Sequence, residues 1–260
     1  MSKSNKIIII FIIFIVVYAI VFFILLGGPK RLSQEKNTAT IILDSVIWNY
    51  EDNNWTNITQ EDSISKLNWK KYTVYEDDKK LGNYYLWYDG SKWYLFDKDR
   101  NSKEYYGELL AYKANYDIKM VKFAQKDIDN YDYIEEVLET KKIDLNADDY
   151  VVSNQIDIDI DKDGQEETFY IVSNSNIYGV TGKTFSLVLM VKNNKTHKLY
   201  FEVKDSEEMT CLPYIRAFMD VDDDDKLETI VGCESLTGSN KRFLYKYTDK
   251  NKYEILISNR

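Results

Sequence analysis

Residues 155–170 read Q-I-D-I-D-I-D-K-D-G-Q-E-E-T-F-Y and place aspartates at every second position ahead of a glycine. The β-branched and aromatic residues that follow are typical of a strand, which predicts a tight loop within a β-hairpin. Within it, Asp159, Asp161, Asp163, Gly164 and Glu167 occupy positions 1, 3, 5, 6 and 9. Such a loop is either a solvated acidic turn or a cage for a metal ion.

The same pattern occurs a second time, sixty-one residues further along the chain. The stretch D-V-D-D-D-D-K-L-E places Asp220, Asp222, Asp224, Asp225 and Glu228 at the same five positions, and a threonine follows each glutamate. One such stretch is unremarkable in an acidic chain. Two copies in one register, each beside strand-like segments, indicate a repeated structural unit.

Calcium chemistry explains the spacing of the carboxylates. The ion takes six to eight oxygen ligands at about 2.3–2.6 Å, and alternate side chains on a tight turn converge while the intervening ones point away. Gly164 suits the left-handed backbone that such a turn needs at position 6. Asp225 takes that position in the second copy, and aspartate also tolerates this conformation.

An EF-hand does not fit either copy. That loop requires a glutamate at position 12 and a helix after it. Here position 12 is Tyr170 or Val231, and the residues after each loop favour strands. The closing acid stands at position 9 instead, so each loop is expected to join two strands.

The two stretches resemble the FG-GAP or VCBS-type calcium loops of integrin-like β-propellers, with the pattern D-x-D-x-D-G-x-x-E/D in a β-hairpin. The resemblance covers about residues 150–260 and implies calcium bound by the side chains at positions 1, 3, 5 and 9 and the carbonyl at position 7. The implied ligands are Asp159, Asp161, Asp163, Gln165, Glu167, Asp220, Asp222, Asp224, Lys226 and Glu228, for one or two ions. The second copy departs from the pattern because it lacks the glycine. About 220 residues are too few for a closed propeller, so we expect an incomplete, propeller-like or a compact β-domain.

The N-terminal segment is expected to be a membrane anchor. Residues 7–26 are twenty uncharged residues, which as a helix span roughly 30 Å, the thickness of a bilayer core. A cleaved signal peptide is the alternative, although its apolar region usually has about 7–15 residues. We therefore expect a cytoplasmic head at 1–6, a single transmembrane anchor at 7–26, a linker at 27–37 and an exported C-terminal domain at the cell membrane.

The exported part is predicted to be mainly β. Residues 38–145 are rich in Trp and Tyr and residues 146–260 contain both acidic loops, so a domain boundary is expected near residue 145. A hairpin should turn at Asp89-Gly90. One short helix is expected near residues 131–142, with Asn130 as its cap.

Two further candidate features lie in this part of the chain. Cys211 and Cys233 either form a disulfide, which is favoured outside the cytoplasm, or are two buried free thiols on adjacent strands. Trp87 and Trp93 are candidates for stacking on a sugar ring; the alternative is that both faces of that hairpin are packed in a core, which is the commoner use of aromatic residues.

Composition excludes several functions. The chain has 34 basic and 43 acidic residues, which argues against nucleic-acid binding. Its single histidine, His197, has no accompanying nucleophile motif, and one histidine is too few for a histidine zinc site. The sequence thus predicts a calcium-stabilised surface binding or adhesion module rather than an enzyme. The alternatives are a glycan-binding or glycan-processing envelope protein and a scaffold subunit of an envelope complex.

Overall fold

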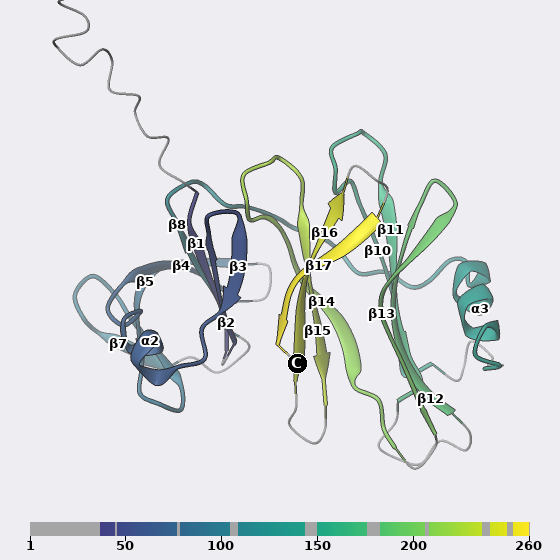
Figure 1. Ribbon diagram of the computed structural model, residues 1–260, viewed down its shortest axis with the longest axis horizontal. Helices are drawn as coiled ribbons and strands as arrows, with labels where there is room; N and C mark the ends of the chain where they lie inside the picture. Colours follow the sequence, from purple (N-terminus) through teal and green to yellow (C-terminus); the bar gives the residue numbers. More distant parts are fainter. Residues whose placement is uncertain are drawn as a thin grey trace, which may run out of the picture. The chain divides into compact units, whose positions relative to one another are not determined.

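The computed structural model describes residues 37–44, 46–76, 79–104, 109–143, 150–175, 183–205, 208–235, 240–248 and 252–259. The described residues are mainly β, as expected, and their strands form three antiparallel sheets (Figure 1). The predicted head and anchor lie outside the described residues, as does the linker except for Asn37. Among the helices that the structure describes, none is long and apolar enough to cross a membrane.

The first sheet has eight strands in the order β3-β2-β1-β8-β4-β5-β6-β7. Its strands are β1 (Ala39–Leu43), β2 (Val46–Glu51), β3 (Asn54–Asn57), β4 (Lys71–Glu76), β5 (Lys79–Tyr88), β6 (Trp93–Phe96), β7 (Ser102–Glu104) and β8 (Leu110–Ala114). The hairpin of β5 and β6 turns at Asp89-Gly90, as predicted, and Gly90 has a φ of 99°. Asp89 stabilises this turn by accepting hydrogen bonds from the amides of Ser91 and Lys92.

The C-terminal half contains two meanders of four strands each. The four-stranded sheet has the order β10-β11-β12-β13, and the second meander continues as β14 to β17, with the short β9 added at its edge to make a five-stranded sheet. The strands are β9 (Lys119–Val121), β10 (Val152–Ile158), β11 (Glu167–Ser173), β12 (Lys183–Lys192), β13 (Lys195–Asp205), β14 (Leu212–Asp220), β15 (Glu228–Glu234), β16 (Lys241–Thr248) and β17 (Lys252–Asn259). Each meander carries one acidic loop between its first two strands, so the repeat in the sequence is a repeat in the fold.

Two helices accompany the sheets in the described residues, α2 (Glu61–Ser65) and α3 (Asp132–Glu139). Helix α3 confirms the short helix expected near residues 131–142. Asn130 accepts a hydrogen bond from the amide of Asp132 at 2.8 Å, although the residue at the helix cap itself is Tyr131. Helix α3 lies beside the four-stranded sheet (Figure 1), and its residues Ile134, Val137 and Leu138 are buried in one cluster with residues of β11 and β12.

The five-stranded sheet is covered on both faces. Alternate residues of its strands point to opposite sides, as the two-residue period of a strand requires. On β14, Phe218 packs with the four-stranded sheet, whereas Met219 packs with the eight-stranded sheet. Both faces are therefore apolar, which explains the nearly continuous burial of β14 and β15.

The change from the first sheet to the others comes before residue 145. Strand β8 ends the eight-stranded sheet at Ala114, and β9 already pairs with β14. Residues 119–139 thus contribute to the C-terminal sheets, so the change of sheet lies at residues 115–118. The domain boundary expected near residue 145 stays a prediction.

A close contact in the five-stranded sheet generates a first prediction. Gly232 on β15 is the cross-strand partner of Tyr214 on β14. A Cβ atom at Gly232 would lie 2.2 Å from Cζ of the Tyr214 ring, so the ring occupies the space of the missing side chain. We expect Gly232→Ala to lower the free energy of unfolding by about 1–3 kcal/mol, the usual cost of overpacking.

Urea denaturation of the two single variants and the double variant measures this effect. The loss caused by Gly232→Ala should be smaller in a Tyr214→Ala background, where the ring is gone. An equal loss in both backgrounds would contradict the steric explanation.

Candidate metal sites and their surroundings

The two acidic loops lie side by side. The first joins β10 to β11 and the second joins β14 to β15. The amide of Leu227 donates a hydrogen bond to the carbonyl oxygen of Ile160 at 2.8 Å, and the Lys162 ammonium lies 2.9 Å from Oδ1 of Asp225. The predicted position of each loop between two strands is therefore confirmed.

Both loops have the same backbone conformation. Positions 4 and 6 have positive φ in each: 58° at Lys162 and 86° at Gly164, then 63° at Asp223 and 68° at Asp225. Asp225 thus adopts the left-handed conformation that the glycine adopts in the first loop, as expected. The absence of a glycine at position 6 therefore does not change the backbone conformation of the second loop.

The hydrogen bonds within the loops also match. The position-1 aspartate accepts from the amide at position 6, at 2.9 Å for Asp159 and 3.1 Å for Asp220. The position-9 glutamate accepts from the amide at position 2, at 2.9 Å for both Glu167 and Glu228. In Asp159, Glu167 and Glu228 these bonds use one oxygen of the carboxylate and leave the other for a cation, whereas the second oxygen of Asp220 also accepts from the amide of Asp224, at 3.2 Å.

The carboxylates at positions 1, 3 and 9 converge in each loop. Asp159, Asp161 and Glu167 each offer an oxygen within 4.8 Å of the other two, and so do Asp220, Asp222 and Glu228. Each group can hold a metal ion. The structure therefore brings together six of the ten ligands expected from the sequence.

The other four expected ligands have different positions. Asp163 and Asp224, at position 5, are outside the two converging groups, and each accepts a hydrogen bond from the amide at position 7. Those amides belong to Gln165 and Lys226, whose carbonyl oxygens are the ligands implied by the resemblance. Their coordination of an ion stays a prediction.

A lysine that the sequence pattern does not reveal reaches into each loop. The Lys192 ammonium lies 2.8 Å from Asp161 Oδ2, 2.9 Å from Asp163 Oδ2 and 2.5 Å from Glu167 Oε1. In the second loop the Lys246 ammonium lies 2.5 Å from Asp222, 2.7 Å from Asp224 and 3.4 Å from Glu228. The lysines contact the same three positions, 3, 5 and 9, in both loops.

Strand register places both lysines. Thr168 pairs with Val191 and Thr229 pairs with Tyr245, so each lysine is the next residue on the third strand and lies across from the glutamate. The glutamate-to-lysine separation is 25 residues in the first loop, from Glu167 to Lys192, but 18 in the second, because both the connection between the strands and the part of the third strand before the lysine are shorter. This unequal spacing hides the lysine from any search for a repeated motif.

Burial dominates the electrostatics of the two glutamates. Glu167 and Glu228 have no solvent-exposed surface. Burial raises the pKa of Glu167, and burial together with the charge of Asp222 raises the pKa of Glu228 to about 8. Burial disfavours the charged form of Lys192, but its three carboxylate contacts outweigh that effect and raise its pKa.

Several carboxylate oxygens are buried without a hydrogen-bond partner among the described residues. In the first loop these are Asp159 Oδ1 and Asp161 Oδ1, and in the second Asp222 Oδ1 and Glu228 Oε1. Buried acceptors of this kind are rare in folded proteins, where an ordered water or an ion usually satisfies them. One ammonium therefore does not satisfy every buried carboxylate oxygen of either loop.

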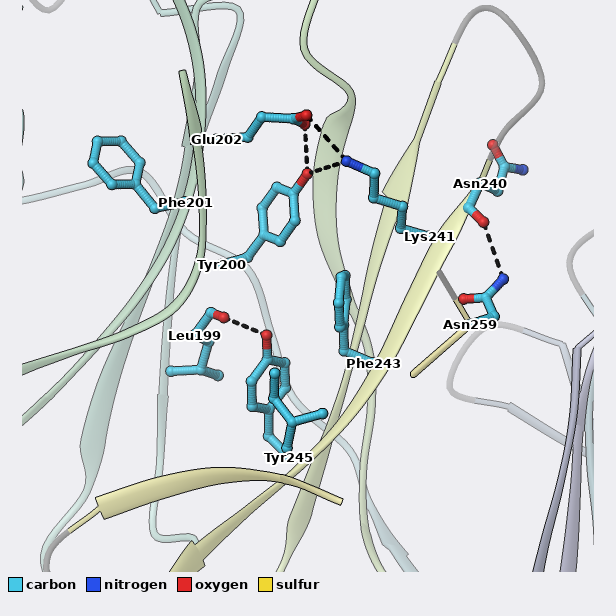
Figure 2. A pocket seen from close by; sticks show the side chains of 10 residues that line it. Leu199, Tyr200, Phe201, Glu202, Asn240, Lys241, Phe243, Tyr245 and Asn259 are labelled. Atoms are coloured by element: carbon cyan, nitrogen blue, oxygen red, sulfur yellow. Dashed lines mark hydrogen bonds and ion pairs between the residues drawn. The ribbon is translucent and has the colours of Figure 1, made fainter. Parts of the chain in front are cut away.

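A separate pocket of about 510 Å³ lies between β13 and the strands β16 and β17 (Figure 2). The Tyr200 hydroxyl donates to Glu202 at 2.6 Å, and the Lys241 ammonium lies 3.1 Å from both groups. Burial pushes the pKa of Glu202 up, but the Tyr200 and Lys241 contacts outweigh it and hold the pKa below its ordinary value.

The chemistry of this pocket does not match two-carboxylate glycoside hydrolysis. Of the described residues that line it, Glu202 alone is acidic. That reaction needs a second carboxylate and an acid with a raised pKa. The aromatic residues Phe243 and Tyr245 instead make the pocket wall apolar (Figure 2).

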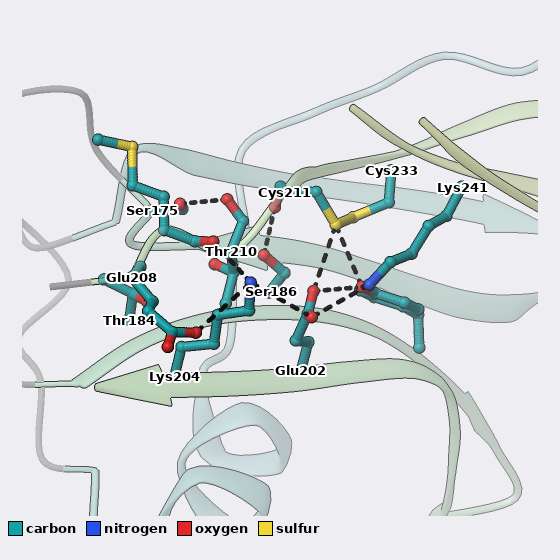
Figure 3. Close-up of polar contacts among 12 residues, drawn as sticks. Ser175, Thr184, Ser186, Glu202, Lys204, Glu208, Thr210, Cys211, Cys233 and Lys241 are labelled. Carbon is teal, nitrogen blue, oxygen red and sulfur yellow. Dashed lines mark hydrogen bonds and ion pairs between the residues drawn. A yellow bond between two sulfur atoms is a disulfide. The ribbon is translucent and has the colours of Figure 1, made fainter. Parts of the chain in front are cut away.

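The expected cysteine pair forms a disulfide beside this pocket (Figure 3). Cys211 and Cys233 are joined, with their Cα atoms 5.3 Å apart, which decides between the two alternatives left open by the sequence. The bond closes the end of the β14–β15 hairpin opposite the acidic loop. The segment before β14 is also held by three hydrogen bonds from side-chain hydroxyls to its backbone carbonyls. Ser175 donates to the carbonyl of Thr210, Thr184 to that of Glu208 and Ser186 to that of Cys211.

Five aromatic residues gather on one face of the eight-stranded sheet. Tyr85 and Trp87 on β5 are the cross-strand partners of Phe96 and Tyr94 on β6. Trp69, which precedes β4, adds a fifth ring 4.8 Å from that of Phe96. We call these residues the aromatic face: Trp69, Tyr85, Trp87, Tyr94 and Phe96.

Trp69 is the most unusual residue of this face. Its side chain is 49% exposed, and its φ of 60° is rare for a bulky residue. Such a conformation costs free energy of order 1–3 kcal/mol and is commoner at functional sites than elsewhere. Nothing in the sequence singles out Trp69, because it belongs to no strand and its conformation leaves no sequence signal.

Trp93, one of the two stacking candidates, lies in the core, which is the alternative that the sequence left open. It is 7% exposed on the opposite face of β6 and packs in the core of the eight-stranded sheet. Its indole nitrogen donates a hydrogen bond to the carbonyl oxygen of Asp44 at 2.7 Å. Alternation along the hairpin therefore separates Trp93, which is structural, from Trp87, which belongs to the aromatic face.

No known protein family matches the sequence, and no curated protein or solved structure matches it significantly. The sole histidine, His197, packs against the rings of Tyr247 and Tyr253. Function must be inferred from the acidic loops and the aromatic face themselves.

The raised pKa of Glu228 predicts how stability depends on pH without metal. Between about 4.5 and about 8 the folded protein binds a proton at Glu228 that the unfolded chain has released. Stability therefore falls as pH rises through this range. We expect Glu228→Gln to flatten this dependence, measured as melting temperatures at pH 5 and pH 8 in excess EDTA.

Glu254→Gln is the matched control, because Glu254 is exposed on β17, and it should leave the pH dependence unchanged. A Glu228→Gln variant that loses as much stability between pH 5 and pH 8 as the parent would refute the assignment.

Proposed function

We propose that this chain is a membrane-anchored, extracytoplasmic binding module whose two acidic loops each bind a calcium ion. The observation that carries the proposal is the convergence of three carboxylates in each loop within 4.8 Å. Oxygen ligands of this kind suit a hard divalent cation, and calcium tolerates the irregular geometry of a loop better than magnesium does. The FG-GAP-like spacing supports the same ion.

Charge balance favours a divalent cation. Each loop carries four carboxylates at positions 1, 3, 5 and 9, and one lysine ammonium contacts three of them. In the first loop a single ammonium leaves about three negative charges when all four groups are ionised, and in the second loop the proton bound by Glu228 lowers this to about two. A calcium ion removes much of the remaining repulsion and takes up buried oxygens that lack partners.

The predicted location outside the cytoplasm is supported by the disulfide. Structural disulfides persist in oxidising compartments and are rare in the cytoplasm. Cys211 and Cys233 form such a bond. Calcium is also abundant outside cells, where sites with dissociation constants of about 10⁻⁴–10⁻³ M are useful.

The calcium proposal predicts a thermal shift. With calcium at about ten times the dissociation constant, linkage adds about 1.4 kcal/mol per site. For a domain of this size that is a rise of a few °C in melting temperature per site. We expect calcium to raise the melting temperature of the full chain in detergent, and Asp161→Ala or Asp222→Ala to remove about half of the rise.

Asp127→Ala is the control, because Asp127 is exposed and lies outside both loops. Magnesium at the same concentration should shift the melting temperature less. An unchanged melting temperature in calcium, with the parent and all variants folded, would refute calcium binding and leave the loops as acidic turns.

The aromatic face favours a second candidate function, binding to a polysaccharide. Rings presented side by side on a sheet are suited to stack on the apolar faces of sugar rings, and Trp87 and Tyr94 lie 5.4 Å apart. Polar groups border the rings: the Lys92 ammonium lies over the Tyr94 ring, and Thr73 and Asn83 form a hydrogen-bonded pair on neighbouring strands. These groups can bind sugar hydroxyls.

We expect the protein to be retained by an insoluble polysaccharide such as peptidoglycan or chitin, and Trp69→Ala and Trp87→Ala to weaken retention about tenfold, or about 1.4 kcal/mol. Trp55→Ala is the matched control, because Trp55 packs on Tyr50 outside the aromatic face. The second candidate would be contradicted if every variant were retained as strongly as the parent, or if the parent itself were not retained.

A further inference from the structure

Each acidic loop holds a cation of its own, the ammonium of Lys192 or Lys246. We propose that these lysines are tethered competitors of the metal ion: they close the loops in the metal-free protein, and calcium must displace them to bind. The proposal rests on the proposed calcium sites and names the residues that set their affinity. It makes each loop an exchange site between an internal and an external cation.

Two independent occurrences support this role. Lys192 and Lys246 reach positions 3, 5 and 9 of their loops from equivalent places on β12 and β16. The chain connecting glutamate and lysine differs in length between the two meanders, so the similarity lies in the fold and not in sequence spacing. A chance ion pair would not recur at the same three positions.

The lysine and a metal ion would need the same carboxylates. Lys192 hydrogen-bonds to Asp161 and Glu167, two of the three groups that converge in the first loop. Lys246 contacts Asp222 and Glu228 in the same way. Two cations that share these ligands repel each other at short range in a poorly solvated site, so binding of one weakens binding of the other.

Unused oxygens show that the ammonium is an incomplete substitute for a metal. Glu228 is fully buried, yet its Oε1 has no hydrogen-bond partner among the described residues and lies 3.4 Å from the Lys246 ammonium. Asp222 Oδ1 is likewise buried without a partner. These atoms are buried acceptors of residues that belong to the converging group, and a metal ion bound there can take them as ligands.

The two lysines are not held equally. Lys192 has a 9% exposed side chain and contacts Glu167 at 2.5 Å, and its ammonium also lies 5.3 Å from the centre of the Tyr247 ring. The Lys246 side chain is 18% exposed and lies farther from its glutamate, 3.4 Å from Glu228, but closer to its aspartates, 2.5 Å from Asp222 and 2.7 Å from Asp224. Each lysine thus has one contact at 2.5 Å, and we expect calcium to displace both.

Lysine labelling in the unmodified full chain tests displacement directly. A water-soluble acetylating reagent, followed by mass spectrometry, reports how accessible each ammonium is with calcium or with EDTA. We expect calcium to accelerate labelling of Lys246 and Lys192 several-fold and to leave the exposed Lys198 unchanged. Unchanged labelling of both lysines at a calcium concentration that raises the melting temperature would overturn the proposal.

Calcium titration calorimetry of Lys192→Met and Lys246→Met tests the competition. Methionine keeps most of the length of the side chain, being one atom shorter than lysine, and removes its charge, so each variant should bind calcium at least about tenfold more tightly at its own loop. Lys198→Met, which removes an exposed lysine on β13, is the control for net charge and should bind as the parent does. The methionine variants should also melt lower than the parent in EDTA and recover in calcium.

The outcomes separate this proposal from the proposed function. If the parent binds no calcium but either methionine variant does, the lysines are the competitors proposed here and the parent's loops are closed by ammonium alone. If parent and methionine variants bind with equal affinity, or if no variant binds, the lysines do not compete with calcium and the inference is wrong.

Discussion

The C-terminal half depends on how two buried glutamates are neutralised. Glu167 and Glu228 begin the second strand of each meander and have no exposed surface. An isolated buried carboxylate costs several kcal/mol, so each needs hydrogen bonds and a cation nearby. The amides of Ile160 and Val221 supply the bonds, and a lysine from the third strand supplies the cation. Three consecutive strands of each meander are thus tied together at one point.

The acidic loops could be predicted from sequence because their information is local. Alternating aspartates, a residue tolerant of positive φ and strand-forming neighbours all lie within nine residues, and the repeat confirms the register. Asp225 illustrates this, since the position alone indicated its left-handed backbone. Lys192 and Lys246 could not be predicted, because their positions depend on the pairing of β11 with β12 and of β15 with β16 across connections of different length.

The aromatic half shows a similar limit. Alternation along residues 84–96 shows which residues share a face of the hairpin. It does not show which of the two faces is buried in the core. Burial of Trp93 and exposure of Tyr85 follow from the packing of the eight-stranded sheet around Leu86 and Leu95. Trp69 joins the exposed face through a ring contact with Phe96, from a position outside any strand. Only tertiary structure brings these residues together.

The disulfide limits what exchange of a cation can change. The β14–β15 hairpin is closed at one end by Cys211–Cys233 and at the other by the acidic loop, and both faces of its sheet are packed. The disulfide therefore keeps the register of the hairpin fixed when calcium replaces the ammonium at the loop end. The metal-free and calcium-bound states should share one fold, because each has a cation among the same carboxylates. They should differ in stability and in the position of one lysine side chain at each loop. Such a loop responds to the surrounding calcium concentration, but the protein stays folded when calcium is scarce.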